Sequence, residues 1–203
     1  MKAFKNSELK SKDGRMKTIY QKMFEQAKPF LRTRQNLIHT KIVLRYGINL
    51  LEKVKGDEEL VVPAILLHDV GWKTVPESLQ LAAFGPNLSN PQAARLHEVE
   101  GAKTARQILE GLHYPPEKVN EICRIIRGHD SRKRSISRSD RIVKDADKLF
   151  RYSRQGTAID VIRFHMHRED YLSYLERHLE KWFFLSVSRE LAREELAQRR
   201  RES

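Results

Sequence analysis

The sequence predicts an all-α fold, in which a bundle of helices surrounds a central core. Apolar residues recur with helical spacing along most of the 203 residues, whereas only a few short pieces such as residues 60–62 resemble strands. Hydrophobic residues make up 39% of the chain and charged residues 33%, which is typical of a globular protein with a buried core. The length corresponds to one ordinary domain, or to one domain with arms.

Two helices are expected in the first third of the chain. In residues 32–55, His39 and the apolar residues after it recur at spacings of four, three and four, and Gly56 ends the segment. Residues 58–70 are shorter and more apolar, and they end at Gly71. This second segment therefore predicts a central helix that is buried on most sides.

A long loop follows, and two further helices come after it. Residues 73–91 contain three prolines, two asparagines and a glycine, which indicates a loop with one short helix near residues 78–84. Residues 91–112 return to a helical pattern. The next helix starts at Pro115 and Pro116, where a missing N–H costs nothing, and its apolar stripe extends to His129.

The last third of the chain begins with a basic, serine-rich stretch, residues 131–141, which we interpret as a mobile loop. In the helix after it, Asp145 and Asp147 lie about 200° apart, so only one of them is expected to point inward easily. Residues 158–200 predict two helices or one broken helix. The first dozen residues and the final QRRRES are expected to fray.

Charge and composition restrict the partners of the protein. A net charge of +12 favours anions, and phosphate-bearing molecules head that list. The longest apolar stretch, residues 60–67, is far shorter than the ~20 residues that cross a bilayer, and the first residues are charged where a signal peptide would be apolar. We therefore expect a cytoplasmic protein without a membrane partner.

A single cysteine excludes cysteine-rich metal sites, so histidines and carboxylates must hold any metal.

Six polar residues lie among apolar residues on the faces expected to turn inward. They are His39, His68, Asp69, His97, His129 and Asp147. A lone histidine of this kind is usually a hydrogen-bonded core residue. Burying all six in one small core is costly unless something pairs with them, and a bound cation does so in one place.

The order of these residues resembles the HD superfamily of metal-dependent phosphohydrolases, which is named for an adjacent His-Asp pair. The matching motifs are LIHTKIV, AILLHDVGW, HEVEGAKTA, IIRGHD and VKDADKLF, within residues 32–152. The resemblance implies an all-α helical bundle with a central metal site. It also implies that residues 1–203 form a single HD domain, with a basic N-terminal arm and a C-terminal helical extension.

The resemblance further implies one or two divalent transition-metal ions. His39, His68, Asp69 and Asp147 would bind the first ion. His97 and His129 would bind the second, with Asp69 as the bridge. Imidazole and carboxylate ligands suit Mn, Fe, Co, Ni or Zn. Two such cations, about 3.5–4 Å apart, can bind a shared hydroxide as nucleophile and clamp the phosphoryl oxygens.

Further residues are candidates for catalysis and substrate binding beside Asp69. In several HD branches the third residue after the His-Asp pair is a Lys or Glu that contacts phosphate or acts as an acid. Here that residue is Trp72. Either Lys73, the next residue, takes over the phosphate contact, or no residue fills this role. Glu98, next to His97, is a candidate for supporting a metal ligand from behind or for transferring a proton. Arg127 and Arg132 flank His129 and are candidates for binding substrate phosphates. For each of these residues, a solvated surface position is the alternative.

The leading hypothesis is a hydrolase that cuts a phosphate ester or anhydride in a nucleotide-like small molecule by attack of metal-bound hydroxide. The second is an HD-type nuclease or phosphodiesterase that acts on RNA or single-stranded DNA. The net positive charge of the chain favours this hypothesis. The lack of aromatic residues beside residues 131–141 weakens it. The third is a non-catalytic, metal-binding regulatory module. The intact ligand set argues against it. The sequence does not predict an oligomeric state.

Overall fold

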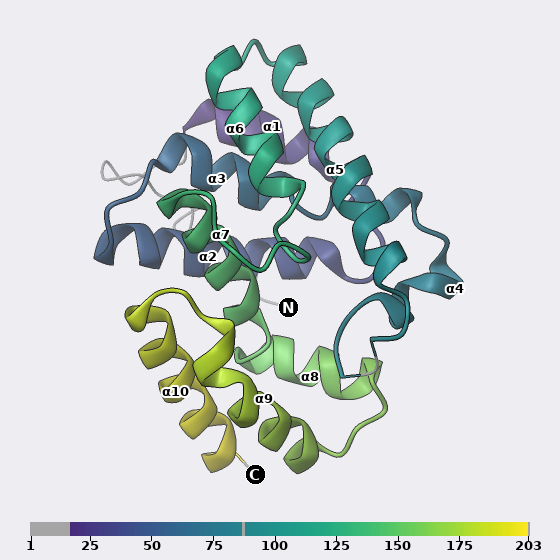
Figure 1. The fold of residues 1–203 in the computed structure, drawn as a ribbon, viewed down its shortest axis with the longest axis vertical. Coiled ribbons are helices and arrows are strands. Elements are labelled where there is room, and N and C mark those ends of the chain that lie inside the picture. The colour runs from purple at the N-terminus through teal and green to yellow at the C-terminus, as the bar shows by residue number, and fades with distance from the viewer. Residues whose placement is uncertain (1–16, 87, 203) are drawn as a thin grey trace.

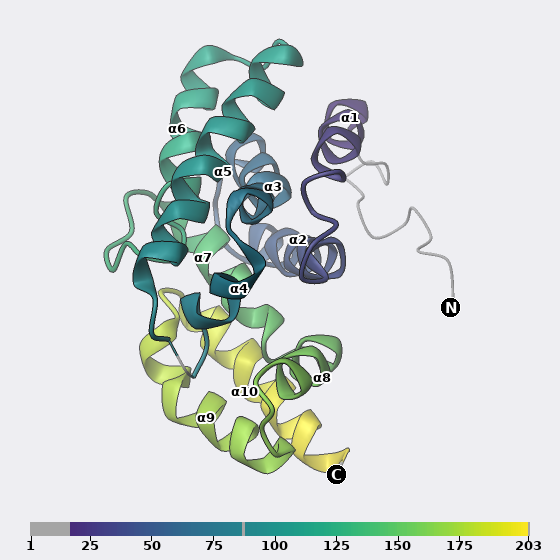
Figure 2. The same cartoon turned by 90° about the vertical axis from the view of Figure 1, so that its right-hand side faces the viewer.

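The computed structural model describes residues 17–86 and 88–202, and all regular secondary structure in these ranges is helical. The predicted all-α fold is confirmed. Figures 1 and 2 show the pair α5 and α6 at one end of the molecule, α8 to α10 at the other, and α2, α3 and α7 between them. None of the helices in these ranges is long and apolar enough to cross a membrane.

The centre of the bundle consists of α2 (Asn36–Lys53), α3 (Glu58–Leu67) and α7 (Arg138–Phe150), which pack against one another. Every residue from 60 to 67 is buried, as expected for a central helix. Gly47 allows α2 to approach α3 closely, because a Cβ atom there would lie 2.2 Å from Ile65 Cδ1. The first helix, α1 (Thr18–Ala27), covers α3.

A proline in the middle of α3 is compensated by a tertiary hydrogen bond. Pro63 has no N–H, so the carbonyl of Glu59, four residues earlier, loses its helical donor. The hydroxyl of Tyr114 donates to this carbonyl at 2.8 Å. The buried helix therefore keeps its carbonyl satisfied despite the proline.

Helix α3 ends earlier than predicted, at Leu67, and a short 3-10 helix (Val70–Thr74) follows. This turn lies directly against α5 (Pro91–Gly111), because Gly71 has no side chain and a Cβ atom there would lie 2.0 Å from the carbonyl oxygen of His97. The predicted loop after it contains α4 (Glu77–Gln80) and a second 3-10 turn (Leu81–Ala83). The close approach brings the end of α3 to the middle of α5.

Helices α5 and α6 (Pro116–Ile126) form an antiparallel pair, and the chain then returns through residues 127–137 to α7. The stretch predicted as a mobile loop is held by defined contacts. Arg132 pairs with Asp140 at 3.0 Å, and Ser137 caps α7. Lys144 donates to the carbonyl oxygens of Gly128, His129 and Arg132 at 2.5, 2.9 and 3.0 Å.

The last described part of the chain forms three helices, α8 (Arg154–Arg163), α9 (Arg168–Trp182) and α10 (Ser186–Arg201), rather than the two helices or one broken helix expected for residues 158–200. The expectation of a frayed QRRRES is wrong for its described part, since α10 continues to Arg201 and Arg199 is buried. The other expected frayed end, the first dozen residues, lies outside the described residues. The core is continuous from α1 to α10.

Both aspartates of α7 are largely shielded from solvent, contrary to the expectation that only one would point inward easily. Asp147 faces the middle of the bundle. Asp145 faces the C-terminal helices and accepts from the backbone N–H groups of Phe184 and Leu185, both at 2.9 Å. Helix α7 therefore has a second buried face, which lies against the junction between α9 and α10. The sequence pattern did not reveal this face.

Candidate metal centre

The six residues with inward polar side chains meet in the middle of the bundle, and they come from five different helices or helix ends. His39 lies in the first turn of α2, His68 and Asp69 at the end of α3, His97 in α5, His129 after α6 and Asp147 in α7. His68 is the residue that caps α3, so His68 and Asp69 leave the helix in a geometry that lets both reach the same point.

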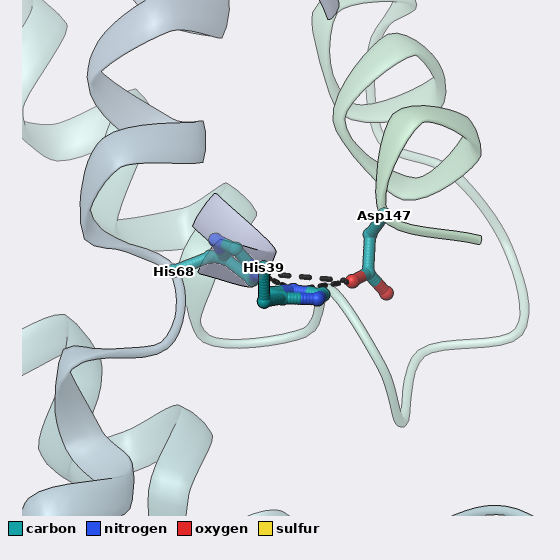
Figure 3. A group of neighbouring side chains, drawn as sticks. All are labelled: His39, His68 and Asp147. Carbon is teal, nitrogen blue, oxygen red and sulfur yellow. Dashed lines mark hydrogen bonds and ion pairs between the residues drawn. The ribbon is translucent and has the colours of Figure 1, made fainter. Parts of the chain in front are cut away.

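The first group of ligand atoms comes from His39, His68, Asp69 and Asp147. His39 Nε2 lies 3.0 Å from His68 Nε2, 3.1 Å from Asp147 Oδ1 and 3.4 Å from Asp69 Oδ2. Figure 3 shows His39 and His68 pointing toward each other and toward Asp147. His39, His68 and Asp147 offer atoms close enough together to surround one cation, and Asp69 is similarly grouped with His68 and His129.

The second group comes from His97, His129, Asp130 and again Asp69. His97 Nε2 lies 3.3 Å from His129 Nε2, and the two nitrogens lie 3.7 and 3.8 Å from Asp130 Oδ2. Asp69 Oδ1 lies 3.9 Å from the first nitrogen and 3.7 Å from the second. Since Asp69 Oδ2 faces the first group, one carboxylate connects the two.

Asp130 is a site residue that the sequence reasoning missed. It directly follows His129, so the chain carries a second His-Asp pair in IIRGHD. That pair was the available signal. Its meaning was hidden because residues 127–131 form a turn after α6, where helical spacing no longer predicts side-chain direction.

Contacts on the side away from the ligand atoms fix the orientation of three of the imidazoles. Nδ1 of His68 and Nδ1 of His129 each lie 2.8 Å from a backbone carbonyl three residues earlier, at Ile65 and Ile126. A carbonyl can only accept, so Nδ1 carries the hydrogen and Nε2 is left as a ligand. His97 is instead stacked on Trp72, with ring centroids 3.9 Å apart, and Trp72 donates to Asp69 Oδ1 at 3.0 Å.

The cluster favours positive charge at its centre. Burial acts to raise the pKa of Asp69, but the neighbouring histidines hold that pKa well below its ordinary value. Burial likewise acts to lower the pKa of His129, but the hydrogen bond to Asp69 and the charge of Asp130 raise it to about 9. Protons or metal cations can supply this positive charge.

The donor set fits divalent metal ions. Each group offers two imidazole nitrogens and one carboxylate of its own, and the oxygens of Asp69 lie 3.4 Å from His39 Nε2 in the first group and 3.7 Å from His129 Nε2 in the second. Mixed nitrogen and oxygen ligands suit Mn, Fe, Co, Ni or Zn, whereas Mg and Ca prefer oxygen alone.

The sequence pattern of the family described as HD domain matches residues 36–152, more than half of the chain. The chain belongs to the HD domain family. The predicted resemblance is thereby confirmed. No curated protein and no solved structure matches the chain significantly.

Glu98 lies behind the second ligand group of this HD domain and supports it. Its fully buried carboxylate accepts from the backbone N–H groups of Asp130 and Ser131 at 2.8 and 2.9 Å, and from the Ser131 hydroxyl at 2.5 Å. Arg95 pairs with it at 2.9 Å. The carboxylate is thus occupied in holding the turn that carries His129 and Asp130.

The predicted phosphate-contact residues are not brought to the HD-domain centre. Lys73 is exposed, and Arg127 lines a separate cavity on the outer side of α5 and α6. Arg132 donates to the Arg124 carbonyl and to Asp140, both at 3.0 Å. The arginines that line the pocket beside the ligands are Arg34, Arg151 and Arg163.

A larger cavity of about 520 Å³ adjoins the HD-domain centre through Asp130, Lys148 and Arg151. One wall carries Tyr174, His178 and Trp182 from α9, whose neighbouring ring centroids lie 4.5 and 4.8 Å apart. The chain has no aromatic residues next to the basic loop in sequence, but the fold brings these three beside it from about 40 positions further along the chain.

Proposed function

We propose that this HD-domain protein is a metal-dependent phosphohydrolase that cleaves a phosphate ester or anhydride in a nucleotide-like small molecule. HD-domain proteins are in general metal-dependent phosphohydrolases. The observation that carries the proposal is the sharing of Asp69: its two oxygens face two separate groups of ligand atoms. Paired cations are a recurring arrangement for phosphoryl displacement.

When bound, two divalent cations lower the pKa of a coordinated water and neutralise charge on phosphoryl oxygens. The residues of the chain supply the rest. Lys148 Nζ lies 2.9 Å from Asp130 Oδ1 and 3.4 Å from Asp147 Oδ2, so it ties the two ligand groups together on their outer side. Arg34, Arg151 and Arg163 give the adjoining pocket a positive wall that favours a phosphate.

The aromatic cavity supports a nucleotide-like substrate. A nucleobase is planar, and a stack on an aromatic side chain contributes about 1–3 kcal/mol per base. Tyr174, His178 and Trp182 offer such faces beside Lys148 and Arg151. A phosphate at the metal centre and a base in this cavity would use both features at once.

Metal analysis and a substrate panel together test the proposal. The purified full-length protein should contain one or two transition-metal ions per chain, and it should release phosphate from at least one member of a panel of nucleotides and short RNA. Phosphate release that is abolished by a chelator and restored by metal supports the proposal. Bound metal without release from any phosphate compound contradicts it, and would favour a non-catalytic metal-binding module.

A polymeric substrate is the second candidate, because Ser131 and Lys133 of the basic loop line the aromatic cavity. Single-stranded nucleic acid is bound by such combinations of cations and aromatic faces. The salt dependence of binding distinguishes the two. Affinity for a polymer falls steeply with added salt, whereas affinity for a small substrate changes mildly. Cleavage of short RNA with a steep salt dependence would establish this alternative.

A further inference from the structure

Three guanidinium groups line the same small pocket as the metal-facing carboxylates. Arg34, Arg151 and Arg163 share this pocket with ligands from both groups, among them Asp69 and Asp130. The arginines and the ligand carboxylates therefore surround one small space, and an anion held by the arginines would lie next to the ligand atoms.

Arg34 is held in place by aromatic rings, and part of its guanidinium group has no hydrogen-bond acceptor. Its guanidinium lies between two aromatic rings, 3.7 Å from the centroid of Trp72 and 3.9 Å from that of Phe84. Its Nε and Nη1 atoms are buried and have no hydrogen-bond partner among the described residues. Burying a donor without a partner is unfavourable, so this edge is suited to an acceptor from outside the chain.

The backbone that presents Arg34 is strained. Arg34 and Gln35 both have left-handed φ values, 53° and 60°, just before α2 begins. Non-glycine residues adopt this conformation at some cost, and it persists where surrounding contacts enforce it. One such contact comes from Arg163, whose Nη2 donates to the Arg34 carbonyl oxygen at 2.8 Å.

One carboxylate holds the other two arginines. Asp160 is fully buried and pairs with Arg151 at 2.8 Å and with Arg163 at 2.9 Å, and it also accepts from the Tyr171 hydroxyl at 2.6 Å. Asp160 offsets one of the three arginine charges, and cations at the metal centre would offset Asp69, Asp130 and Asp147 in the same lining, so excess positive charge would remain for an anion. Such an excess attracts an anion, and a rigid guanidinium matches phosphate oxygens in a bidentate way.

Two of the three arginines lie outside the matched HD-domain span. Arg34 precedes residues 36–152 and Arg163 follows them, whereas Arg151 lies within them, so segments flanking the span complete the wall of the pocket.

We propose that Arg34, Arg151 and Arg163 form a subsite for a second phosphoryl group, joined directly to the one at the metal centre, so that the substrate is a phosphoanhydride. This inference rests on the proposed function for the place of the first phosphoryl group. Because the arginines and the ligand carboxylates line the same pocket, a phosphoryl group on the arginines would adjoin the one at the metal centre.

Hydrolysis then forms a bond between the phosphorus at the metal centre and a water oxygen, and it breaks the bridging P–O bond. The bridging oxygen leaves with the electron pair on the second phosphate, and the two water protons are divided between the two phosphate products. Fixed guanidinium groups stabilise the charge that develops on this leaving phosphate.

Calorimetric binding to the Mn²⁺-loaded full-length protein tests the subsite without turnover. Methylenediphosphonate carries two linked phosphoryl analogues and resists hydrolysis, whereas methylphosphonate carries one. We expect Arg34→Gln and Arg163→Gln each to weaken methylenediphosphonate binding by about tenfold or more, as for a lost charged hydrogen bond, and to leave methylphosphonate binding within about threefold. Metal content is measured alongside for every variant.

Arg32→Gln is the matched control, because Arg32 is an exposed arginine two residues away, and it should leave both affinities unchanged. Arg34→Lys keeps the charge but loses the planar fork, and it serves if Arg34→Gln lowers the melting temperature strongly. Equal weakening of both ligands, or no weakening of either, would overturn the subsite.

These experiments distinguish a failure of the proposed subsite from a failure of the proposed function. Arginine-dependent diphosphonate binding in a protein that hydrolyses no phosphate compound would retain the subsite and remove the hydrolase. Hydrolysis of phosphate esters, with diphosphonate binding unaffected by the arginine variants, would retain the hydrolase and remove the subsite.

Discussion

Asp69 is the residue on which both ligand groups depend. Its Oδ2 lies 3.4 Å from His39 Nε2 and its Oδ1 lies 3.7 Å from His129 Nε2, so each oxygen serves a different group. Trp72 holds the carboxylate in this orientation. A change at Asp69 should therefore affect both ions, whereas a change in an imidazole should affect one.

Replacing Asp69 with alanine should abolish both metal retention and hydrolysis, because each ligand group loses a charged oxygen. Elemental analysis and phosphate release measure the two effects. Asp170→Ala, a change at an exposed carboxylate in α9, is the control and should alter neither. Full activity of the Asp69 variant would reject the assignment of the centre.

Replacing His97 with alanine should remove the second ion alone, because the first ligand group does not contain this imidazole. Metal stoichiometry of the purified variant is the measurement, with His113→Ala, at an exposed histidine, as the control. An unchanged stoichiometry would count against a centre with two ions.

At the scale of elements, the centre depends on how helices end and approach one another. Helix α3 stops at Leu67, which directs His68 and Asp69 to one point, and Gly71 lets the following turn touch α5 beside His97. The hydrogen bond from Tyr114 to the Glu59 carbonyl lets α3 contain Pro63 in a buried position. The contacts of Gly71 and Tyr114 join segments that are far apart in the sequence.

Replacing Tyr114 with phenylalanine should lower the free energy of unfolding by about 1–2 kcal/mol, because the Glu59 carbonyl loses its donor. The effect should shrink in a Pro63→Ala background, where the restored N–H of residue 63 can donate to the same carbonyl. Denaturant unfolding of the four proteins measures the coupling. An equal loss in both backgrounds would show that the hydroxyl does not compensate for the proline.

At the scale of the whole molecule, the C-terminal helices are part of the same body as the matched HD-domain span. A continuous core extends from α1 to α10, Asp145 of α7 accepts from the junction of α9 and α10, and Arg163 of α8 lines the pocket beside the metal centre. We propose that the chain folds as a single HD domain with this helical extension, and that it unfolds in one transition.

Removing bound metal with a chelator should lower the melting temperature of that single transition. At a free metal concentration about 100 times Kd, binding stabilises the folded state by about 2.7 kcal/mol. For a chain of this size each kcal/mol corresponds to about 2–4 °C, so a decrease of about 5–10 °C is expected. Calorimetry with and without chelator measures it, and Asp69→Ala should show no decrease.

The sequence predicted much of this centre because the predicted ligands lie in helices or at their ends. His39, His97 and Asp147 follow helical spacing, so their inward direction could be read from the apolar residues around them. Asp130 could not be placed in this way, because it lies in a turn. Asp145 was ambiguous for a different reason: its helix has two buried faces, and the sequence does not show how many neighbours a helix has.

The sequence by itself determined the all-α class, the HD-domain family and the six polar residues of the centre, since residue type and helical period are local properties. Tertiary structure alone decided which arginines and aromatic side chains surround that centre. Arg34 and Arg163 meet across 129 positions of the chain, and Trp182 faces a loop that precedes it by about 50. Such neighbours depend on the packing of whole helices, which no local pattern of residues specifies.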